Sequence, residues 1–199
     1  MYTLVLGSTN IGKLKDYQAL LSPYAINLVP QTELAVPEVA ETGLSFVENA
    51  LIKARHAAQF SNLPALGDDS GLVVESLGGT PGLHSARYAG TDATAEDNMQ
   101  KLLHTLAQDP KASRKAHFYS VIVLLRHPYD PAPLICEGTW EGEILKAPCG
   151  KNGFGYLPIF YSSHHQCPAA ELTLQDRNRV SHRAQAFQQL FDKYLKQYA

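Results

Sequence analysis

The sequence predicts an α/β or α+β fold with a mixed β-sheet and flanking helices. Short apolar runs rich in β-branched residues alternate irregularly with segments of helical periodicity, which favours a mixed sheet over a doubly wound parallel one. The chain has 199 residues, of which 45% are apolar and 18% charged, the composition of an ordinary globular protein with a sizeable core. Because no internal repeat, low-complexity tract or linker interrupts it, a single domain over residues 1–199 is expected.

The chain opens with a strand, a loop and a helix. The apolar run of residues 2–7 ends in glycine and predicts a buried strand. Residues 12–22 follow with apolar positions at helical spacing, and residues 26–30 predict a second strand.

The next segment predicts a helix followed by an acidic turn. A capping box of Ser45 and Glu48 starts a helix over residues 45–60. Residues 64–77 predict a strand, an acidic turn and a strand. The glycine-rich residues 78–90 predict a loop.

The second half predicts a helix, three strands, a loop and a last helix. A Thr–Asp capping box starts a helix over 94–108, and residues 116–126 are rich in β-branched and aromatic side chains, as in a strand. Residues 133–145 predict two strands around a central glycine, and residues 150–161 a glycine- and aromatic-rich loop. Residues 173–195 carry an apolar stripe that predicts one helix.

Bulk chemistry argues against several classes of protein. The formal net charge is −2, whereas broad nucleic-acid binding needs an excess of Lys and Arg. The longest mostly apolar run, residues 117–125, is about half of what a membrane-spanning helix needs, and we expect no signal peptide. Three cysteines without C-x-x-C spacing favour unpaired thiols in a reducing cytoplasm over a disulfide framework or a zinc site.

The stretch GSTNIGK, residues 7–13, is similar to a phosphate-binding loop. It matches G-x-x-x-x-G-K, but Leu14 stands where a Walker A motif needs Ser or Thr to bind Mg²⁺. Small donors in the turn and Lys13 at a helix start still suit an anion, because a helix N-terminus attracts negative charge. A surface turn with a solvated lysine explains the stretch as well, so both interpretations stay open.

Acidic residues could form a metal site. Asp68 and Asp69 are adjacent, and because neighbouring carboxylates repel, their joint ionisation favours a nearby cation such as Mg²⁺. Glu38 and Glu41 precede the next helix and could serve its dipole, or one of them could complete the site with Asp69. An Asx-rich turn is the simpler explanation of the two aspartates alone. Asn49 and Lys53, one turn apart, are interpreted by default as a solvated helix face.

Two later stretches could contact a nucleobase. In GFGY, residues 153–156, a planar base could stack on an aromatic ring while the glycines let the backbone come close. An aromatic-anchored hairpin turn is the alternative. Arg177 and the SHR stretch, residues 181–183, can meet one ligand only if their helix starts, bends or breaks near Ser181.

Taken together, these stretches resemble the inosine triphosphate pyrophosphatases, and the bacterial members most closely. The motifs that carry the resemblance are collinear from residue 4 to about residue 190: STNIGK, ETGLSFVENALIKA, DDSGLVVESLGGTPGLHSARYAG, GFGYLPIF and SHR. The middle block alone is highly specific to that family.

The resemblance implies an elongated α/β fold whose long mixed sheet and flanking helices form two lobes around an active-site cleft. It implies an enzyme that hydrolyses ITP, dITP or XTP to the monophosphate and pyrophosphate, by attack of water at the α-phosphate. It also implies a Mg²⁺ cofactor, a nucleotide as the ligand, and a cytoplasmic homodimer.

The resemblance also implies roles for individual residues. Asp69 would bind Mg²⁺ and act as the general base, while Asp68 and Glu41 would support the metal. The predicted substrate-binding residues are Ser8, Thr9, Asn10, Ile11, Gly12, Lys13 and Lys53 for the phosphates, Ser70, and Phe154, Gly155, Tyr156, Leu157, Arg177, His182 and Arg183 for the base.

Departures from the family pattern keep other functions open. Leu157 stands where the family usually has Asp, Arg177 where Lys is usual, and Ala184 where Gly is common. A pyrophosphatase of altered base preference and a nucleotide-binding sensor without turnover are therefore alternatives. A P-loop NTPase that releases single phosphate is a third, which Leu14 disfavours. We expect Leu157→Asp to raise the dITP/dATP ratio of kcat/KM.

Overall fold

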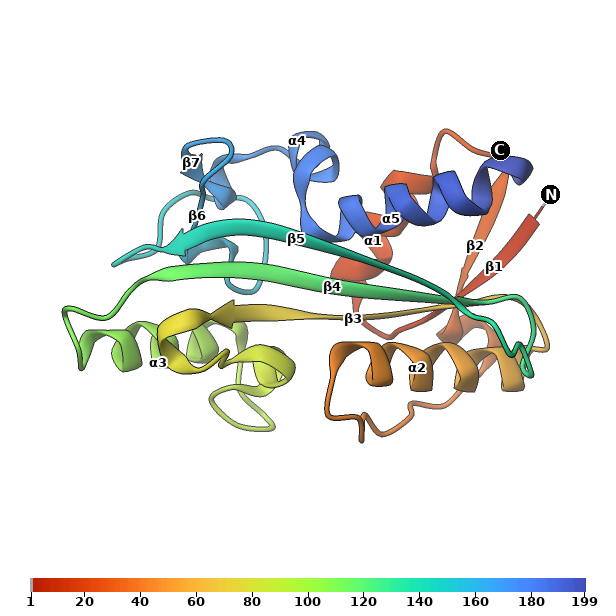
Figure 1. Ribbon diagram of the computed structural model, residues 1–199, viewed down its shortest axis with the longest axis horizontal. Helices are drawn as coiled ribbons and strands as arrows, with labels where there is room; N and C mark the ends of the chain where they lie inside the picture. The colour runs from red at the N-terminus through yellow and green to blue at the C-terminus, as the bar shows by residue number, and fades with distance from the viewer. Residues whose placement is uncertain (1) are drawn as a thin grey trace. The chain divides into compact units, whose positions relative to one another are not determined.

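The computed structural model describes residues 2–199 and contains a mixed seven-stranded sheet with flanking helices (Figure 1). The strand order is β2-β1-β3-β4-β5-β6-β7; β1 runs parallel to β2 and β3, whereas β6 is antiparallel to β5 and β7. The predicted α/β class with a mixed sheet is therefore confirmed. The strands are β1 (Tyr2–Gly7), β2 (Ile26–Pro30), β3 (Ala65–Val74), β4 (Lys115–Leu125), β5 (Leu134–Ile144), β6 (Phe160–Ser162) and β7 (Cys167–Pro168). The helices are α1 (Ile11–Leu21), α2 (Phe46–Ser61), α3 (Ala95–Ala107), α4 (Leu174–Val180) and α5 (His182–Lys193).

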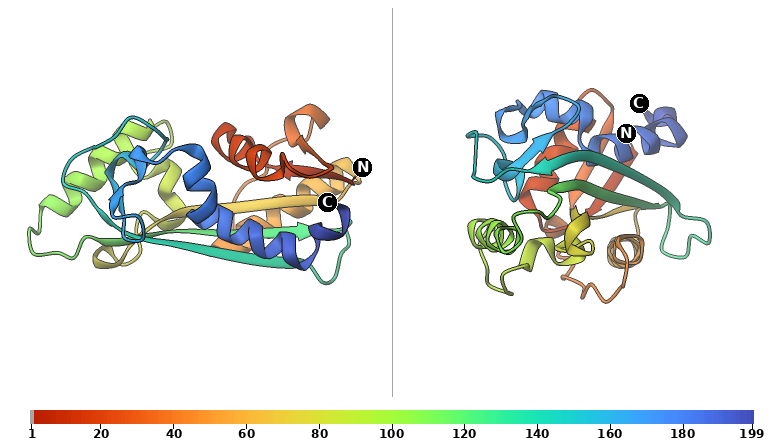
Figure 2. Two further views of the ribbon diagram at one scale, coloured as in Figure 1. Left: turned by 90° about the horizontal axis from the view of Figure 1, so that it is seen from above. Right: turned by 60° about the vertical axis from the view of Figure 1, so that its left-hand side comes forward.

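The chain forms two compact units, and β3, β4 and β5 contribute to both. The first unit comprises Met1–Asp69, Ser120–Gly138 and His182–Ala199. The second comprises Ser70–Tyr119 and Thr139–Ser181. In the first unit, α2 lies on one face of the sheet and α1 and α5 lie on the other, with α5 running along β5 (Figure 2).

The first unit is packed by side chains that alternate along β1. Leu4 and Leu6 join an apolar cluster with Tyr17 of α1 and residues of α5, whereas Val5 faces the opposite way and packs on Ala57 of α2. Helix α2 lies close to the sheet because β3 has Gly67 beneath it. A Cβ at that glycine would lie 2.0 Å from the carbonyl oxygen of Ala50. This close approach brings the polar side chains of α2 against the end of β3.

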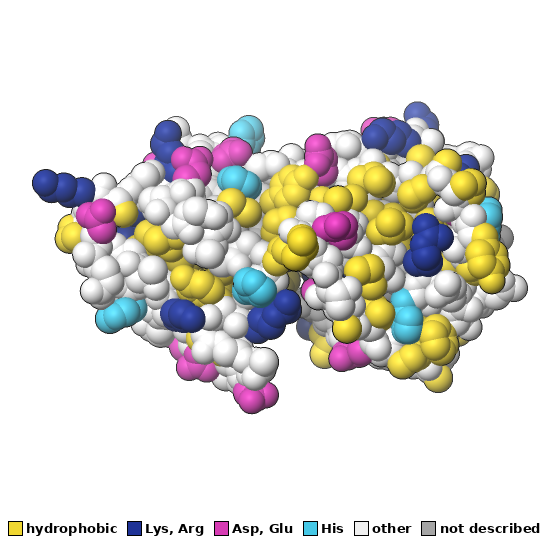
Figure 3. All heavy atoms as spheres, turned by 60° about the horizontal axis from the view of Figure 1, so that its bottom comes forward, with side chains coloured by type: hydrophobic (Ala, Val, Ile, Leu, Met, Phe, Trp, Pro, Cys, Tyr) yellow, Lys and Arg dark blue, Asp and Glu magenta, His cyan; other side chains and the backbone are white. Residues whose placement is uncertain are grey.

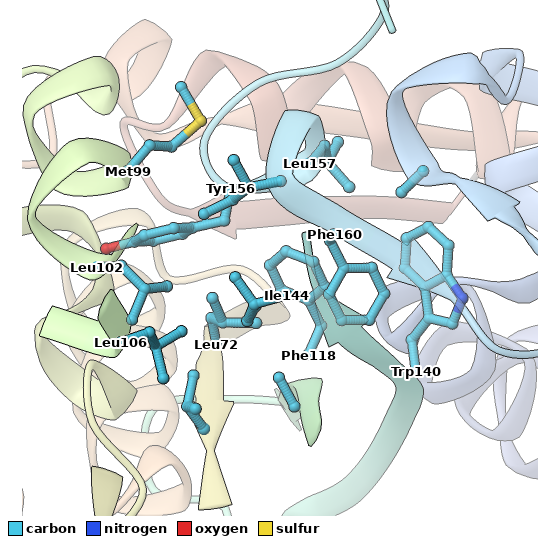
Figure 4. Close-up of a cluster of buried hydrophobic side chains, with 14 of the residues drawn as sticks. Leu72, Met99, Leu102, Leu106, Phe118, Trp140, Ile144, Tyr156, Leu157 and Phe160 are labelled. Carbon is cyan, nitrogen blue, oxygen red and sulfur yellow. The ribbon is translucent and has the colours of Figure 1, made fainter. Parts of the chain in front are cut away.

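The second unit has its own apolar core, built from β3, α3, β4, β5 and the segment that leads into β6. Figure 4 shows Leu102 and Leu106 of α3 facing Leu72 of β3, with Phe118 and Phe160 beyond them. The rings of the last two have centroids 4.7 Å apart. This core fixes the loop before β6, which carries the predicted base-binding stretch.

Three predicted elements differ from the structure. The predicted acidic turn within 64–77 is wrong, because β3 runs unbroken through both aspartates. The predicted pair of strands in 133–145 is one strand, β5, and Gly138 lies inside it. A Cβ there would lie 2.1 Å from the carbonyl oxygen of His182, so this glycine allows α5 to pack on the strand. The single helix predicted for 173–195 is interrupted at Ser181, which is extended with φ −63° and ψ 156°.

The surface carries both signs of charge. Acidic, basic and hydrophobic side chains are interspersed over the face shown in Figure 3. Within residues 2–199, no helix has both the length and the apolar character needed to cross a bilayer. The three cysteines, Cys136, Cys149 and Cys167, are free thiols.

Candidate active site

The two adjacent aspartates of β3 point to opposite faces of the sheet. Successive side chains of a strand alternate, so Asp68 shares a face with Leu66 and Asp69 shares one with Gly67. Asp68 accordingly contacts α1 and α5, and Asp69 contacts α2. The turn in which both carboxylates were expected is therefore absent, but a cation does lie beside each one, Lys13 at Asp68 and Lys53 at Asp69.

Four side chains bind the fully buried carboxylate of Asp68. At Oδ1, the Lys13 ammonium lies 3.2 Å away and the Ser120 hydroxyl donates over 3.3 Å. At Oδ2, the Tyr17 hydroxyl donates over 3.0 Å and the Arg183 Nε over 2.8 Å. Burial alone would raise the pKa of Asp68, but the lysine and the arginine hold it well below its usual range. Asp68 is thus a fixed anion that orients two cationic side chains.

Lys13 lies in the first turn of α1, behind the predicted phosphate loop. Asn10 caps this helix, because its Oδ1 accepts the Lys13 backbone N–H at 3.1 Å, and Ser8 Oγ accepts the Asn10 N–H at 3.2 Å. The Lys13 ammonium also donates to the Asp68 carbonyl oxygen at 2.9 Å. Burial lowers the pKa of Lys13, although Asp68 acts against that shift. A capped helix N-terminus backed by a buried ammonium has the chemistry of an anion site.

The other residues of this loop lie nearer the surface. Thr9 is exposed, and its hydroxyl donates to Glu38 Oε1 at 2.8 Å. Ile11 is 68% exposed and Gly12 is half-buried at the start of α1. The structure therefore brings the loop together with Lys13, while its contact with phosphate stays a prediction.

On the other face of the sheet, Lys53 of α2 joins Asp69 to Glu41. Its ammonium lies 2.8 Å from Asp69 Oδ1 and 3.2 Å from Glu41 Oε1. Burial raises the pKa of Asp69. Burial alone would lower the pKa of Lys53, but Asp69 and Glu41 outweigh it and raise that pKa. Since two carboxylates share one ammonium here, negative charge is in local surplus and attracts cations.

Asp69 and Glu41 fit a magnesium site of the kind that substrate completes. Among residues 2–199, no three His, Cys, Asp or Glu side chains form a group that could hold a metal ion by themselves, and Asp68 faces the other side of the sheet. Mg²⁺ is usually bound by one or two carboxylates together with water and substrate phosphates rather than by a protein cage. Two carboxylates that already converge on one ammonium match that pattern.

Sequence reasoning missed several residues around the aspartates. Asn49 is 1% exposed and donates to Asp69 Oδ2 at 3.4 Å, so the interpretation of Asn49 and Lys53 as a solvated face is wrong. Their spacing of one helical turn was a signal that could have placed both on the sheet. Tyr17 is one of the apolar positions of the helix predicted over residues 12–22, and its hydroxyl also donates to Asp68 Oδ2 at 3.0 Å.

His182 and Arg183 begin α5 directly after the break at Ser181. Besides its contact with the buried aspartate, Arg183 donates from Nη1 to Asp16 Oδ2 at 2.7 Å, a partner with no local sequence signal. Burial and the neighbouring guanidinium of Arg183 hold the pKa of His182 well below its usual value, so its imidazole is neutral at neutral pH. Arg177 lies on α4 in the second unit. The break required for these side chains to meet one ligand is present, while their contact with a base stays a prediction.

The predicted base-binding stretch lies in the second unit and divides into an exposed and a buried part. Phe154 is 45% exposed and precedes Gly155, whose φ of +62° lies in the left-handed region that favours glycine. Tyr156 points into the apolar core, and its hydroxyl donates to the Ser85 carbonyl at 2.8 Å (Figure 4). Leu157 is 7% exposed in the same core. Only the exposed part of the stretch offers a free aromatic face.

Arg177 lies beside this loop, and Ser70 lies at the start of the second unit. A Cβ at Gly153 would lie 2.6 Å from Leu157 Cδ1 and 3.2 Å from Arg177 Nη1, so the leucine and the arginine flank one glycine. Ser70 is half-buried in β3, directly after Asp69. The structure thus gathers Phe154, Leu157 and Arg177 around one loop.

Comparisons with known proteins agree in family and fold. The model of the Ham1 family matches residues 4–193. The dITP/XTP pyrophosphatase of Xylella fastidiosa (strain 9a5c) is 54% identical over 192 residues, 96% of this chain and 96% of that protein. The enzyme of the same name from Escherichia coli (strain K12) is 50% identical over 96% of this chain and 98% of that protein. The solved structure of a HAM1 protein from Coxiella burnetii has 52% identity and a TM-score of 0.91, covering 98% of this chain and 100% of that one.

Proposed function

This chain belongs to the Ham1 family, and on that premise we propose that it is a dITP/XTP pyrophosphatase. It hydrolyses non-standard purine nucleoside triphosphates, namely ITP, dITP and XTP, to the nucleoside monophosphate and pyrophosphate, and so removes them from the nucleotide pool. The observation that carries the proposal is the arrangement around β3, where Asp69 meets Lys53 and Glu41 while Asp68 holds Lys13.

The triphosphate binds at the loop that leads into α1. A nucleoside triphosphate carries about four negative charges, which need cations and aligned donors for neutralisation. Lys13 and Lys53 supply positive charge, and Ser8, Thr9 and Asn10 supply small donors before a helix N-terminus. Ile11 and Gly12 add backbone N–H groups of the first helical turn, which have no partner within the helix.

Asp69 is the general base. Water attacks the α-phosphorus, the bond from that phosphorus to the α,β-bridging oxygen breaks, pyrophosphate leaves with this oxygen, and Asp69 takes the proton of the water. An aspartate of ordinary pKa, about 4, is a weak base, and burial raises the pKa of Asp69 above its ordinary value. Asp69 and Glu41 would hold Mg²⁺, which neutralises phosphate charge and makes bound water more acidic. Asp68 supports the site by fixing Lys13 and Arg183.

Base selection falls to the residues that the resemblance assigns to it. Inosine and xanthine carry a 6-keto acceptor where adenine carries a 6-amino donor, so a fixed donor rewards the keto group and opposes adenine. Arg177, His182 and Arg183 are the donors proposed for this contact, with Ser70 as a further substrate contact. The exposed ring of Phe154 is proposed to stack on the base, with Gly155, Tyr156 and Leu157 shaping that wall.

The family resemblance also underlies the proposals on domain organisation, oligomeric state, compartment and partners. The protein is proposed to act as a single domain over residues 1–199, as a cytoplasmic homodimer, with a nucleotide as its ligand and neither nucleic acid nor a membrane as partner. Free thiols at all three cysteines support a reducing compartment, and the net charge of −2 argues against broad nucleic-acid binding.

One assay tests the function. The purified protein is given Mg²⁺ and, separately, dITP, XTP, dGTP and dATP, and the nucleotide products and pyrophosphate or single phosphate are measured. Monophosphate and pyrophosphate, mainly from dITP and XTP, are expected. Equal release from all four nucleotides would instead support the pyrophosphatase of altered base preference that Leu157 suggests. Binding of dITP without any product would support the sensor, and the pyrophosphatase proposal would be abandoned.

A further inference from the structure

Asn49 is a buried polar side chain that contacts both Asp69 and the segment that carries Glu41. It lies in the first turns of α2 with 1% of its surface exposed. A buried amide is costly unless its donor and its acceptor both find partners. Both do so here, and the partners belong to the segment of Glu41 on one side and to Asp69 on the other.

The orientation of the Asn49 amide follows from its partners. The backbone N–H of Gly43 can only donate, and it lies 2.8 Å from one end of the amide, which must therefore be the oxygen Oδ1. The nitrogen Nδ2 then faces Asp69 and donates to Oδ2 over 3.4 Å. A Cβ at position 43 would lie 2.7 Å from Asn49 Oδ1, so a glycine there allows this close approach.

Lys53 makes the matching pair of contacts one turn further along α2. Its ammonium takes the other oxygen of Asp69, Oδ1, at 2.8 Å, and Glu41 Oε1 at 3.2 Å. The two oxygens of Asp69 are thus engaged by two residues of one helix. The segment with Glu41 is held to that helix two residues away, at Gly43. Helix α2 therefore sets both the rotation of the Asp69 carboxylate and its relation to Glu41.

We propose that Asn49 is a positioning residue for the pyrophosphate-releasing reaction. By donating to Asp69 and accepting from Gly43, it fixes the Asp69 carboxylate and the Glu41 segment relative to each other, so that both can engage one divalent cation. This inference rests on the roles proposed above for Asp69 and Glu41. The simpler alternative is that Asn49 only anchors the segment around Gly43 to the start of α2.

Glu48 provides a matched control for that alternative. Its Oε2 accepts the backbone N–H of Leu44 at 2.9 Å and the Ser45 hydroxyl at 2.7 Å. Glu48→Ala therefore loosens the same segment from the same helix, next door to Gly43, without removing any contact of Asp69. If Asn49 is only an anchor, Asn49→Ala and Glu48→Ala should have similar effects.

The experiment compares wild type, Asn49→Ala, Asn49→Asp and Glu48→Ala. With dITP at saturating Mg²⁺, we expect kcat of Asn49→Ala to fall about 10–100-fold with a smaller change in KM, as is typical when a partner of a metal ligand is lost. Asn49→Asp keeps an acceptor for Gly43 and the size of the side chain but loses the donor, so its kcat should fall as well. Circular dichroism melting shows whether each variant is folded. If Asn49→Ala does not fold, the comparison with wild type uses Asn49→Asp alone.

A binding measurement adds a readout that does not depend on turnover. The Mn²⁺ dissociation constant is measured by electron paramagnetic resonance in the presence of the inert analogue α,β-methylene-dITP. We expect it to rise about tenfold or more in Asn49→Ala and by less than about twofold in Glu48→Ala.

The outcomes separate this inference from the proposed function. A kcat for both Asn49 variants within about threefold of wild type, or an equal loss in Glu48→Ala, would overturn the positioning role. A wild-type protein that releases no pyrophosphate would overturn the proposed function instead, and the Mn²⁺ measurement would then still decide whether Asn49 organises the carboxylates.

Discussion

Asp68→Asn should destabilise the fold, whereas the same change at Asp69 should not. Asp68 is fully buried, and its carboxylate lies 3.2 Å from Lys13 Nζ and 2.8 Å from Arg183 Nε. Asparagine has nearly the same shape but no charge. The variant therefore leaves two buried cations without their common counter-ion, which costs more than the pair contributes when it is intact.

The size of the loss follows from what each cation keeps. Removing one partner of a buried ion pair typically costs ~3–5 kcal/mol of unfolding free energy. Arg183 retains Asp16 at 2.7 Å, and Lys13 retains the backbone carbonyl of residue 68 at 2.9 Å, so the lower end applies. With 199 residues and an unfolding entropy of about 2.1 cal/mol/K per residue, a loss of about 3 kcal/mol lowers Tm by about 7 °C.

Asp69→Asn is the matched comparison. Burial raises the pKa of Asp69, so the folded state disfavours its ionised form and a neutral amide removes that unfavourable contribution. We expect an unfolding free energy equal to that of wild type within about 1 kcal/mol, or higher. Turnover should nevertheless fall by about 10²–10⁴-fold, as expected when a general base is lost. Asp68→Asn should thus lower the stability of the fold, whereas Asp69→Asn should lower turnover without lowering stability.

The pH dependence gives a second check on the sign of both effects. The folded pKa of Asp68 lies below its unfolded value of about 4, so its stabilisation is complete above that pH and is lost as the pH falls through the folded pKa. The gap in Tm between wild type and Asp68→Asn should therefore narrow in acid. For Asp69 the folded pKa is raised, so any gain from Asp69→Asn should be present at neutral pH and vanish below about pH 4.

Calorimetry and circular dichroism melts at neutral and acidic pH measure these differences. A Tm of Asp68→Asn within about 2 °C of wild type at neutral pH would refute the reasoning about the buried ion pair. An equal loss of Tm in both variants would refute the division of the two aspartates between the sheet faces.

Four further predictions concern packing, the base and the metal. Gly67→Ala places a Cβ 2.0 Å from the Ala50 carbonyl oxygen, so urea unfolding should show a loss of about 3 kcal/mol. Phe154→Ala should leave Tm unchanged but raise KM for dITP about tenfold, because stacking on a base contributes roughly 1–3 kcal/mol. EDTA should stop pyrophosphate release and added Mg²⁺ should restore it; release that survives EDTA would exclude the metal. Leu157→Asp puts a carboxylate into the apolar core, so it should lower the unfolding free energy by about 3 kcal/mol, and by less in acid, where the carboxylate is protonated. An unchanged dITP/dATP ratio of kcat/KM in this variant would count against a role of residue 157 in selectivity.

Local signals predicted most elements of this fold. Thr94 and Asp97 form the predicted capping box, and Ser45 caps its helix by accepting the backbone N–H of Glu48, so each helix starts where its spacing predicted. A short apolar run ending in glycine predicted β1, and β-branched and aromatic side chains predicted β4, because both signals lie within the strand itself. Glycine misled the prediction for β5, since Gly138 serves the close packing of α5 rather than a turn.

Tertiary partners were beyond the reach of such signals. The Arg183–Asp68 contact joins residues 115 positions apart, and the Tyr17–Asp68 contact joins residues 51 positions apart. No local pattern distinguishes a tyrosine that fills a core from one that also donates to a buried carboxylate. The motif resemblance identified Lys13, Lys53 and the aspartates as site residues, but it did not indicate that Asn49 contacts Asp69.

The period of two in β3 explains why two identical, adjacent residues can do different work. A turn would have exposed both carboxylates to one environment, and their mutual repulsion would have had to be relieved there. In a strand, Asp68 faces two cations and two hydroxyls in a closed interior, whereas Asp69 faces Lys53 and Asn49 with negative charge in excess. The surroundings of Asp68 keep its carboxylate ionised and hold two cationic side chains in place. The surroundings of Asp69 favour binding of a proton or a metal ion by its carboxylate. A shift of one residue in the register of β3 would exchange the two environments, so the apolar residues that fix this register, Leu66 and Leu72 among them, also determine which aspartate can act as the base.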